Sequence, residues 1–209
     1  MTLPGQFVVM LGPDGCGKST VIHGLIRHAV EESLYSAIFH FHWRPGLLPQ
    51  LSAFSKRGAA VDFGVDRFNP HKAPPASLPS SWVRVAYYAC DYVAAWPLIA
   101  LHRSRGALIL FDRYFYDFIV DPLRMRVHPA TRLPRRLSHV VPGPDKVIVL
   151  ECDPVVAYAR KAELPVDEAA RQRSAYRDLS KGRKNWHIVD GGRSAEEVLS
   201  EVSRIVFGG

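Results

Sequence analysis

The stretch GPDGCGKST at residues 12–20 is the feature that most constrains how this chain folds. It holds three glycines and a proline, a composition that favours neither a helix nor a strand. The unbroken apolar run FVVML at residues 7–11 precedes it and predicts a strand buried on both faces of a parallel sheet. Apolar residues at helical spacing follow from Lys18 to about Glu32. We therefore expect a glycine-rich loop that joins a buried strand to a helix.

This loop fits the pattern G-x-x-x-x-G-K-[ST] in the strand-to-helix setting that gives the pattern its meaning. The backbone N–H groups of such a loop surround a phosphate, and the N-terminus of the following helix adds partial positive charge. We expect Lys18 to face solvent and reach the outer phosphates of a nucleoside triphosphate, Ser19 to give a hydroxyl to Mg²⁺, and Thr20 to cap the helix. The residues predicted to bind the nucleotide are Gly12, Asp14, Gly15, Cys16, Gly17, Lys18, Ser19 and Thr20.

Further apolar runs alternate with helical patterns along the chain. Strands are predicted over residues 37–43, 107–111, 146–151 and 186–189, and helices over about 81–103, from 154, and over 167–181 and 195–206. Strands that alternate with helices indicate a parallel sheet covered on both sides. We predict an α/β fold of the P-loop NTPase type, a three-layer α/β/α sandwich with a central five-stranded parallel sheet. It would form a single domain over residues 1–209, with a proline-rich insertion at about 44–81.

An acid that positions Mg²⁺ or its water is the next requirement of a triphosphate site, and in P-loop proteins it ends a neighbouring buried strand. Asp112 ends the run ALILF and fits this place. We predict that it holds the metal together with Ser19. An aspartate after a strand also suits a helix N-cap, and the two roles can coexist.

Composition narrows the possible partners. The chain has 27 Lys and Arg against 20 Asp and Glu, a net charge of +7, which suits nucleic acid, an acidic membrane surface or phosphorylated small molecules. No DNA-recognition helix, RNA-binding strand motif or zinc module is evident, so we expect a small-molecule phosphoryl acceptor and no nucleic acid. The longest apolar stretch, residues 93–101, is too short to span a bilayer. Three widely spaced cysteines without a metal pattern indicate reduced thiols in a cytoplasmic protein.

Taken together, GPDGCGKST and FDRY resemble the thymidylate kinase family of nucleoside monophosphate kinases, in which a GxDGxGKST loop is paired with a DR[YH] motif. LECDPVVAYARKAELP resembles that family's strand and the helix leading into its mobile lid, here at about residues 160–175. The resemblance runs in order from Phe7 to the last helix. It implies transfer of the γ-phosphoryl of MgATP to a nucleoside monophosphate, with dTMP as the first expectation, and it leaves a homodimer open.

The resemblance also implies roles for single residues. Asp112 would act near Mg²⁺, Arg113 would bind the acceptor's phosphate, and Asp14 would orient the acceptor or the metal; with Lys18 these are the predicted catalytic residues. Arg44 in WRPG is similar to an arginine that contacts the family's acceptor. Lid residues would neutralise charge on the transferred phosphoryl, and the candidates are Arg160, Lys161, Arg171 and Arg173.

The acceptor site departs from the family's pattern. The family has an Ala-Asp-Arg step where this chain has Asp91 followed by Tyr92, the two further residues that we predict at the acceptor. The missing arginine keeps a second hypothesis open, a kinase of the same fold that phosphorylates a hydroxyl of a sugar, glycan precursor or other metabolite. Asp14, Asp91 or Asp112 would then be the base. A third hypothesis is a regulatory ATPase that uses hydrolysis to bind a partner.

Overall fold

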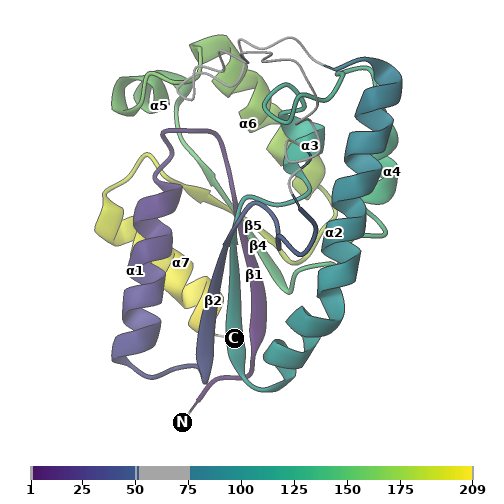
Figure 1. The fold of residues 1–209 in the computed structure, drawn as a ribbon. Coiled ribbons are helices and arrows are strands. Elements are labelled where there is room, and N and C mark those ends of the chain that lie inside the picture. The colour runs from purple at the N-terminus through teal and green to yellow at the C-terminus, as the bar shows by residue number, and fades with distance from the viewer. Residues whose placement is uncertain (1, 50, 52–75, 209) are drawn as a thin grey trace. The chain divides into compact units, whose positions relative to one another are not determined.

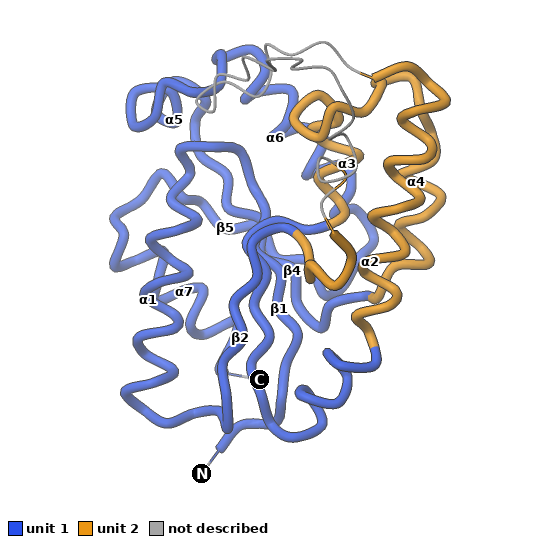
Figure 2. The backbone as a smooth tube through the Cα atoms, viewed as in Figure 1, with its two compact units in different colours: residues 1–43, 97–114, 143–209 blue, residues 44–96, 115–142 orange. Residues whose placement is uncertain are grey.

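The computed structural model describes residues 2–49, 51 and 76–208, which form two compact units (Figure 2). Unit 1 comprises residues 1–43, 97–114 and 143–209, and unit 2 comprises residues 44–96 and 115–142. Most of the predicted proline-rich insertion lies outside the described residues. The single domain expected over residues 1–209 stays a prediction.

Unit 1 is built on a five-stranded sheet with the strand order β2-β3-β1-β4-β5 (Figure 1). The strands are β1 (Gln6–Leu11), β2 (Ala37–His42), β3 (Ala107–Asp112), β4 (Lys146–Glu151) and β5 (Trp186–Asp190). Every pairing between them is parallel. The predicted α/β class and the five-stranded parallel sheet are therefore confirmed. β2 ends one residue earlier than predicted because Trp43 has a φ of 55°, which an extended strand does not adopt.

Side chains from both faces of the sheet are buried. On one face, α1 (Lys18–Glu31) and α7 (Ala195–Phe207) share a core with alternate residues of β1, β3 and β4. The strand residues of this core include Val8, Met10, Leu108, Leu110, Ile148 and Leu150. Phe7 and Phe111 point to the other face, where their ring centroids are 5.5 Å apart. Burial on both sides explains why these strands are continuous apolar runs rather than alternating ones.

The helices begin close to where the sequence predicts them. Asp153 caps α5 (Pro154–Arg160) by accepting from the Val155 N–H at 2.8 Å, as an aspartate before a proline favours. α6 (Val166–Ser180) follows a turn at Pro165. α2 (Leu78–Ser104) begins three residues earlier than predicted. The part of the chain that the structure describes contains no helix long and apolar enough to cross a membrane.

Unit 2 contains most of α2 together with α3 (Asp117–Val120) and α4 (Leu133–Leu137). Phe115 and Phe118, two of the aromatic residues that follow Arg113 in the sequence, are buried in this unit. Phe115 contacts Phe118, with ring centroids 5.1 Å apart, and Tyr92 of α2, with ring centroids 5.7 Å apart. Packing in the core therefore explains these aromatic residues, and no ligand is needed to explain them.

Candidate nucleotide-binding site

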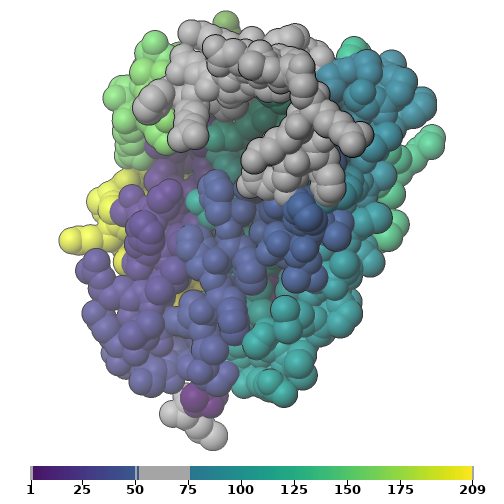
Figure 3. All heavy atoms as spheres, in the orientation of Figure 1, coloured from purple at the N-terminus to yellow at the C-terminus, as the bar shows by residue number. Residues whose placement is uncertain are grey.

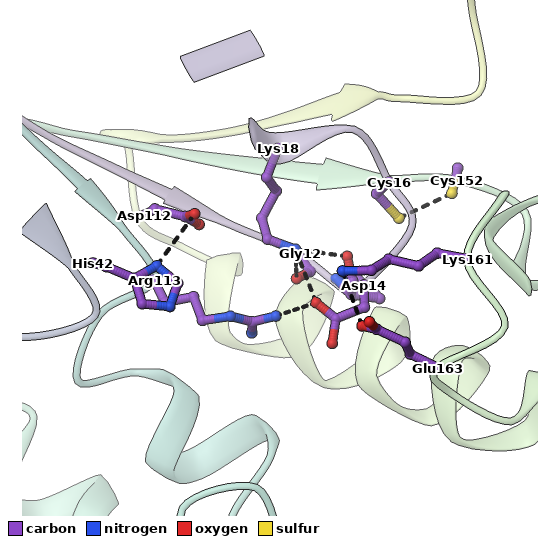
Figure 4. A network of polar contacts seen from close by, with 11 residues as sticks. Gly12, Asp14, Cys16, Lys18, His42, Asp112, Arg113, Cys152, Lys161 and Glu163 are labelled. Atoms are coloured by element: carbon purple, nitrogen blue, oxygen red, sulfur yellow. Dashed lines mark hydrogen bonds and ion pairs between the residues drawn. The ribbon is translucent and has the colours of Figure 1, made fainter. Parts of the chain in front are cut away.

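The carboxyl ends of the parallel strands share one edge of the sheet in unit 1. His42 and Asp112 are register partners at the ends of β2 and β3, and Glu151 and Asp190 are partners at the ends of β4 and β5. The glycine loop leaves the central strand β1 at the same edge, and Figure 4 shows the polar residues gathered around it. Ligands of open α/β sheets bind outside this edge. The fold therefore brings the loop and the predicted acid to one place.

The backbone of the loop depends on its glycines. Gly12, Gly15 and Gly17 have φ values of 137°, 87° and 87°, a region that residues with a Cβ rarely adopt. Gly17 is the N-cap of α1 and provides no side-chain cap. The prediction that Thr20 caps the helix is wrong, because α1 begins at Lys18 and Thr20 lies exposed in its first turn. Because Gly17 has no side chain to cap α1, it leaves the N–H groups of the first turn to bind an anion.

Two of these glycines form a matched pair, because they share a φ of 87° and differ in the space around them. A Cβ at Gly17 would meet nothing within 4 Å, whereas a Cβ at Gly15 would overlap the carbonyl of Ala157 in α5. Gly17→Ala should cost about 1 kcal/mol of unfolding free energy from backbone strain alone. Gly15→Ala should cost about 3 kcal/mol, since steric overlap adds to the strain. Urea unfolding of both variants measures the difference, and equal losses would show that α5 does not pack against the loop.

Lys18 is buried, with 7 % of its surface exposed, so the prediction that it faces solvent is wrong. Its ammonium donates to the carbonyl oxygens of Gly12 and Pro13, each at 2.8 Å, and lies 3.7 Å from the Asp14 carboxylate. Burial and the nearby Arg113 charge lower the pKa of Lys18 to about 8, although Asp14 and Asp112 oppose the shift. The amine is therefore held inside the loop, against the carbonyls on which the loop turns.

Arg113 lies directly after β3 and is also buried. Its φ of 72° is unusual for an arginine and costs about 1 kcal/mol. Its backbone N–H donates to the Met10 carbonyl at 2.9 Å, and its guanidinium donates to the Asp14 carboxylate. The turn after β3 thus directs this side chain to the loop (Figure 4).

Asp112 has two oxygens in different surroundings. Oδ2 lies 3.5 Å from Nδ1 of His42, and Oδ1 is buried with no hydrogen-bond partner among the described residues. Burial alone would raise the pKa of Asp112, but the hydrogen bond of His42 and the charges of Lys18 and Arg113 outweigh it and lower the pKa. An ionised, partly unpaired buried carboxylate is costly unless a cation or water meets it. Asp112 therefore fits Mg²⁺, which takes one or two protein carboxylates and completes its shell with water and phosphate.

His42 is a site residue that the sequence analysis missed. It ends β2, an edge strand whose residues are half-buried or exposed and whose atoms reach the surface of the molecule (Figure 3). The accessible fraction of the His42 side chain is 68 %. The register between β2 and β3 places it opposite Asp112. That register is not readable from the two separate sequence segments. The only signal was a histidine at the end of a predicted strand.

The three predicted lid arginines have different partners. Arg160 donates to the carbonyl of Gly191 at 2.7 Å, and Arg171 forms an ion pair with Glu168 on its own helix. Arg173 lies 3.5 Å from Glu151, a residue that the sequence analysis missed and that also binds Arg177. Lys161 pairs with Glu163 at 3.0 Å. The structure thus joins Arg160 and Arg173 to residues at the carboxyl ends of β5 and β4, whereas Arg171 and Lys161 pair with acids close to them in sequence.

Ion pairs of Glu151 with Arg173 and Arg177 join the end of β4 to α6. Burial alone would raise its pKa, but the hydrogen bonds and charges of Arg177 and Arg173 outweigh it and lower the pKa below the ordinary 4.5. A carboxylate with a lowered pKa stabilises the fold above the ordinary value and loses that contribution as pH falls through the lowered pKa. Glu151→Gln should therefore cost about 2 kcal/mol of unfolding free energy at pH 7, less than for a fully buried pair because Arg177 is half-exposed.

Urea unfolding of this variant and of the wild type between pH 7 and about 3 checks the linkage. The difference between the two proteins should shrink as the medium becomes more acidic. A difference that does not depend on pH would show that the charge of Glu151 contributes nothing. Asp178→Asn is the matched control, because Asp178 lies exposed on α6 and pairs with Lys181, the C-cap residue of that helix.

A cavity of about 190 Å³ lies beside the loop in unit 1. It lies between the first turn of α1 and the segment that joins β5 to α7. Its lining includes Cys16, Gly17, Thr20, Arg160, Gly191 and Arg193. Gly191 packs closely on the loop, because a Cβ there would lie 2.5 Å from the Cys16 carbonyl oxygen. Of these residues, the sequence analysis missed Gly191 and Arg193.

The predicted acceptor residues Arg44, Asp91 and Tyr92 lie in unit 2. Arg44 donates to Asp91 at 3.1 Å, and Asp91 accepts from the backbone N–H groups of Gly46 at 3.1 Å and Leu48 at 2.7 Å. Asp91 and Tyr92 are buried. Asp91 thus holds the segment from Arg44 to Leu48 in a closed turn, which gives it a structural role. A contact of these residues with an acceptor stays a prediction.

Comparisons of the chain with protein-family models and with curated proteins found no match. The site itself has two buried cations, Lys18 and Arg113, and two carboxylates, Asp14 and Asp112, around a loop of left-handed glycines. Ser19 follows Lys18 and is exposed. This arrangement suits a polyphosphate and a divalent cation.

Proposed function

We propose that this chain is a cytoplasmic, ATP-dependent phosphotransferase of the thymidylate kinase type, which transfers the γ-phosphoryl of MgATP to a nucleoside monophosphate, dTMP first. The observation that carries the proposal is the position of Lys18. Its buried ammonium lies inside a loop of three left-handed glycines at the N-terminus of α1. A cation, a helix N-terminus and inward N–H groups are the elements of a phosphate site.

Different residues around the loop would bind the triphosphate, the base, Mg²⁺ and the acceptor. The loop N–H groups and Lys18 would hold the triphosphate, and the adjacent cavity, with Val21 and Val198 in its walls, would take the base. Ser19 and Asp112 would hold Mg²⁺, which when bound neutralises charge on the phosphates. Arg113 would bind the phosphate of the acceptor, with its guanidinium fixed by Asp14. Arg160, Arg171 and Arg173 would supply further positive charge from the lid.

The chemistry asked of the protein is positioning and charge neutralisation, since phosphoryl transfer needs little covalent help. The phosphate of a nucleoside monophosphate is already ionised, so it needs no base. The lowered pKa of Asp112 supports a metal ligand, because a carboxylate of low pKa accepts a proton poorly.

His42 favours a second candidate, a kinase of the same type whose acceptor is a hydroxyl. The proton of a hydroxyl needs an acceptor, and His42 lies exposed with Nδ1 3.5 Å from Asp112. An imidazole nitrogen is the commonest general base in proteins, so His42 is a candidate to accept that proton. The tyrosine at position 92, where the family has an arginine, supports the same alternative.

The experiment is ADP release from MgATP by the purified protein, with dTMP, other nucleoside monophosphates and a panel of sugars as acceptors. Stimulation by a monophosphate, unchanged in His42→Gln, supports the first candidate. Stimulation by a sugar, with kcat at least tenfold lower in His42→Gln, supports the second. ADP release that no acceptor and no loop variant alters would overturn both.

A further inference from the structure

Two cysteines meet behind the glycine loop. Cys16 belongs to the loop and Cys152 follows β4, yet their sulfurs lie 2.9 Å apart. Both side chains are buried, at 1 % and 3 % exposed. Their approach to disulfide bonding distance requires a movement of only roughly 0.9 Å. Cys90, the third cysteine, lies exposed on α2 in unit 2.

We propose that Cys16 and Cys152 form an oxidation site, at which a peroxide converts the two thiols into a disulfide that ties the glycine loop to the end of β4. Formation of the disulfide is independent of the proposed function. Its effect on nucleotide binding rests on that function.

The surroundings of the two sulfurs shift their pKa values in opposite directions. The hydrogen bond from the Cys16 thiol lowers the pKa of Cys152, and burial opposes this lowering. The positive charges of Arg160 and Arg173 lower the pKa further, whereas the negative charge of Asp190 raises it. The same hydrogen bond and burial raise the pKa of Cys16. Cys152 is therefore the nucleophile, because the thiolate is the reactive form, and Cys16 keeps its proton.

The two steps balance. The Cys152 sulfur attacks one oxygen of hydrogen peroxide, the O–O bond breaks, and the products are a sulfenic acid on Cys152 and one water. The Cys16 sulfur then attacks the Cys152 sulfur, the S–O bond breaks, and the hydroxyl leaves with the Cys16 proton as a second water. Each sulfur is oxidised by one electron, and both oxygens of the peroxide are reduced. A dithiol such as dithiothreitol reverses the reaction by exchange.

A route to the thiols is present in the structure. Cys16 lines the 190 Å³ cavity beside the loop, which has room for a molecule as small as hydrogen peroxide. Arg160 lines the same cavity and its charge lowers the pKa of Cys152. Because the Cys152 sulfur lies 2.9 Å from that of Cys16, the cavity brings peroxide close to both thiols.

The consequence for the loop follows from its close packing. Gly15 packs on the Ala157 carbonyl, and Gly191 packs on the carbonyl of Cys16 itself. A shift of Cys16 toward Cys152 cannot be absorbed by these neighbours, so it moves the loop N–H groups that would hold phosphate. Loss of one hydrogen bond to a charged phosphate is enough to weaken binding about tenfold or more. We expect oxidation to weaken binding of MgATP at least tenfold.

The test treats the wild type and two variants with hydrogen peroxide, with and without later dithiothreitol. Cys152→Ser removes the partner of Cys16, and Cys90→Ser is the matched control with the exposed thiol removed. Intact mass and peptide mapping report the disulfide, and titration with MgATP reports affinity. Wild type and Cys90→Ser should lose two hydrogens, form the 16–152 linkage and bind MgATP at least tenfold more weakly until dithiothreitol restores them. Cys152→Ser should form no such linkage, and its affinity should not show the reversible loss.

No 16–152 linkage in the wild type would overturn the proposal, as would a linkage that leaves MgATP affinity unchanged. Failure of the proposed function looks different. The reduced protein would then bind no MgATP at all, while the linkage would still form and would still raise the resistance of the loop segment to proteolysis. In a protein that binds no MgATP, a linkage without that resistance overturns the site as a constraint on the loop.

Discussion

Lys18→Ala is expected to lower kcat for ADP formation by 10²–10³-fold, about the effect of removing one charge-stabilising donor from an active site. Lys18 places its ammonium against the loop carbonyls, so its loss removes the cation that lies inside the loop. The fold should persist. The lowered pKa of Lys18 shows that burying its charge is costly, and alanine removes that cost. Initial rates and urea unfolding of the same preparation separate the two effects.

Lys18→Arg is the matched variant, because arginine keeps a charge at all accessible pH values. In the wild type the free amine loses its proton as pH rises through about 8, whereas a phosphate-bound amine keeps it. Affinity for MgATP should therefore fall as pH rises above 8 in the wild type and stay level in any binding-competent Lys18→Arg protein. Retained turnover in Lys18→Ala would contradict a catalytic role for the glycine loop.

Arg113→Ala should lower kcat/KM for the acceptor by about 10²-fold, through a higher KM and a lower kcat. The guanidinium would bind the acceptor's phosphate, and its loss also leaves Asp14 without an ion pair that fixes it. The measurement is the initial rate of ADP release against the concentration of dTMP, or of whichever acceptor stimulates release. Unchanged kinetics would mean that Arg113 has no part in acceptor binding.

Two further substitutions at this position separate chemistry from backbone strain. Arg113→Lys keeps the charge and loses the two-pronged guanidinium, so it should recover part of kcat/KM. Arg113→Gly loses the side chain but suits the φ of 72°, so its unfolding free energy should exceed that of Arg113→Ala by about 1 kcal/mol. Its kinetics should match those of Arg113→Ala.

The sequence was sufficient for the parts of the fold that local pattern determines. β1, β3 and β4 are buried on both faces, so their residues form continuous apolar runs whose ends are easy to place. The loop and Asp112 were predictable for the same reason, since each directly follows one of these strands. Asp153 and Pro154 likewise mark the start of α5 by local capping chemistry.

Contacts between distant segments were not predictable from these patterns. Cys16 and Cys152 meet across 136 positions of sequence, and His42 meets Asp112 only because β2 and β3 are neighbours in the sheet. Glu151 and Arg177 are joined by the packing of α6 at the end of β4. The first two contacts depend on the strand order and the third on helix packing, and neither has a local signal in the sequence.

The two errors at the loop have one physical cause. Thr20 was expected to cap the helix, as Ser and Thr often do, and Lys18 was expected to lie in a solvent-facing loop. The loop instead ends with a left-handed glycine as N-cap, so the helix starts at Lys18 and its side chain turns in to the carbonyls of Gly12 and Pro13. The conformation of the loop thus outweighs the local preferences of Thr20 and Lys18.

Binding of a nucleoside triphosphate by the loop is measured by calorimetric titration of MgATP into the purified wild type and into Lys18→Ala. We expect one saturable site per chain in the wild type, dependent on Mg²⁺, and binding at least tenfold weaker in the variant. Absence of binding to the wild type, or equal binding to both proteins, would contradict the claim that residues 12–20 hold a nucleoside triphosphate.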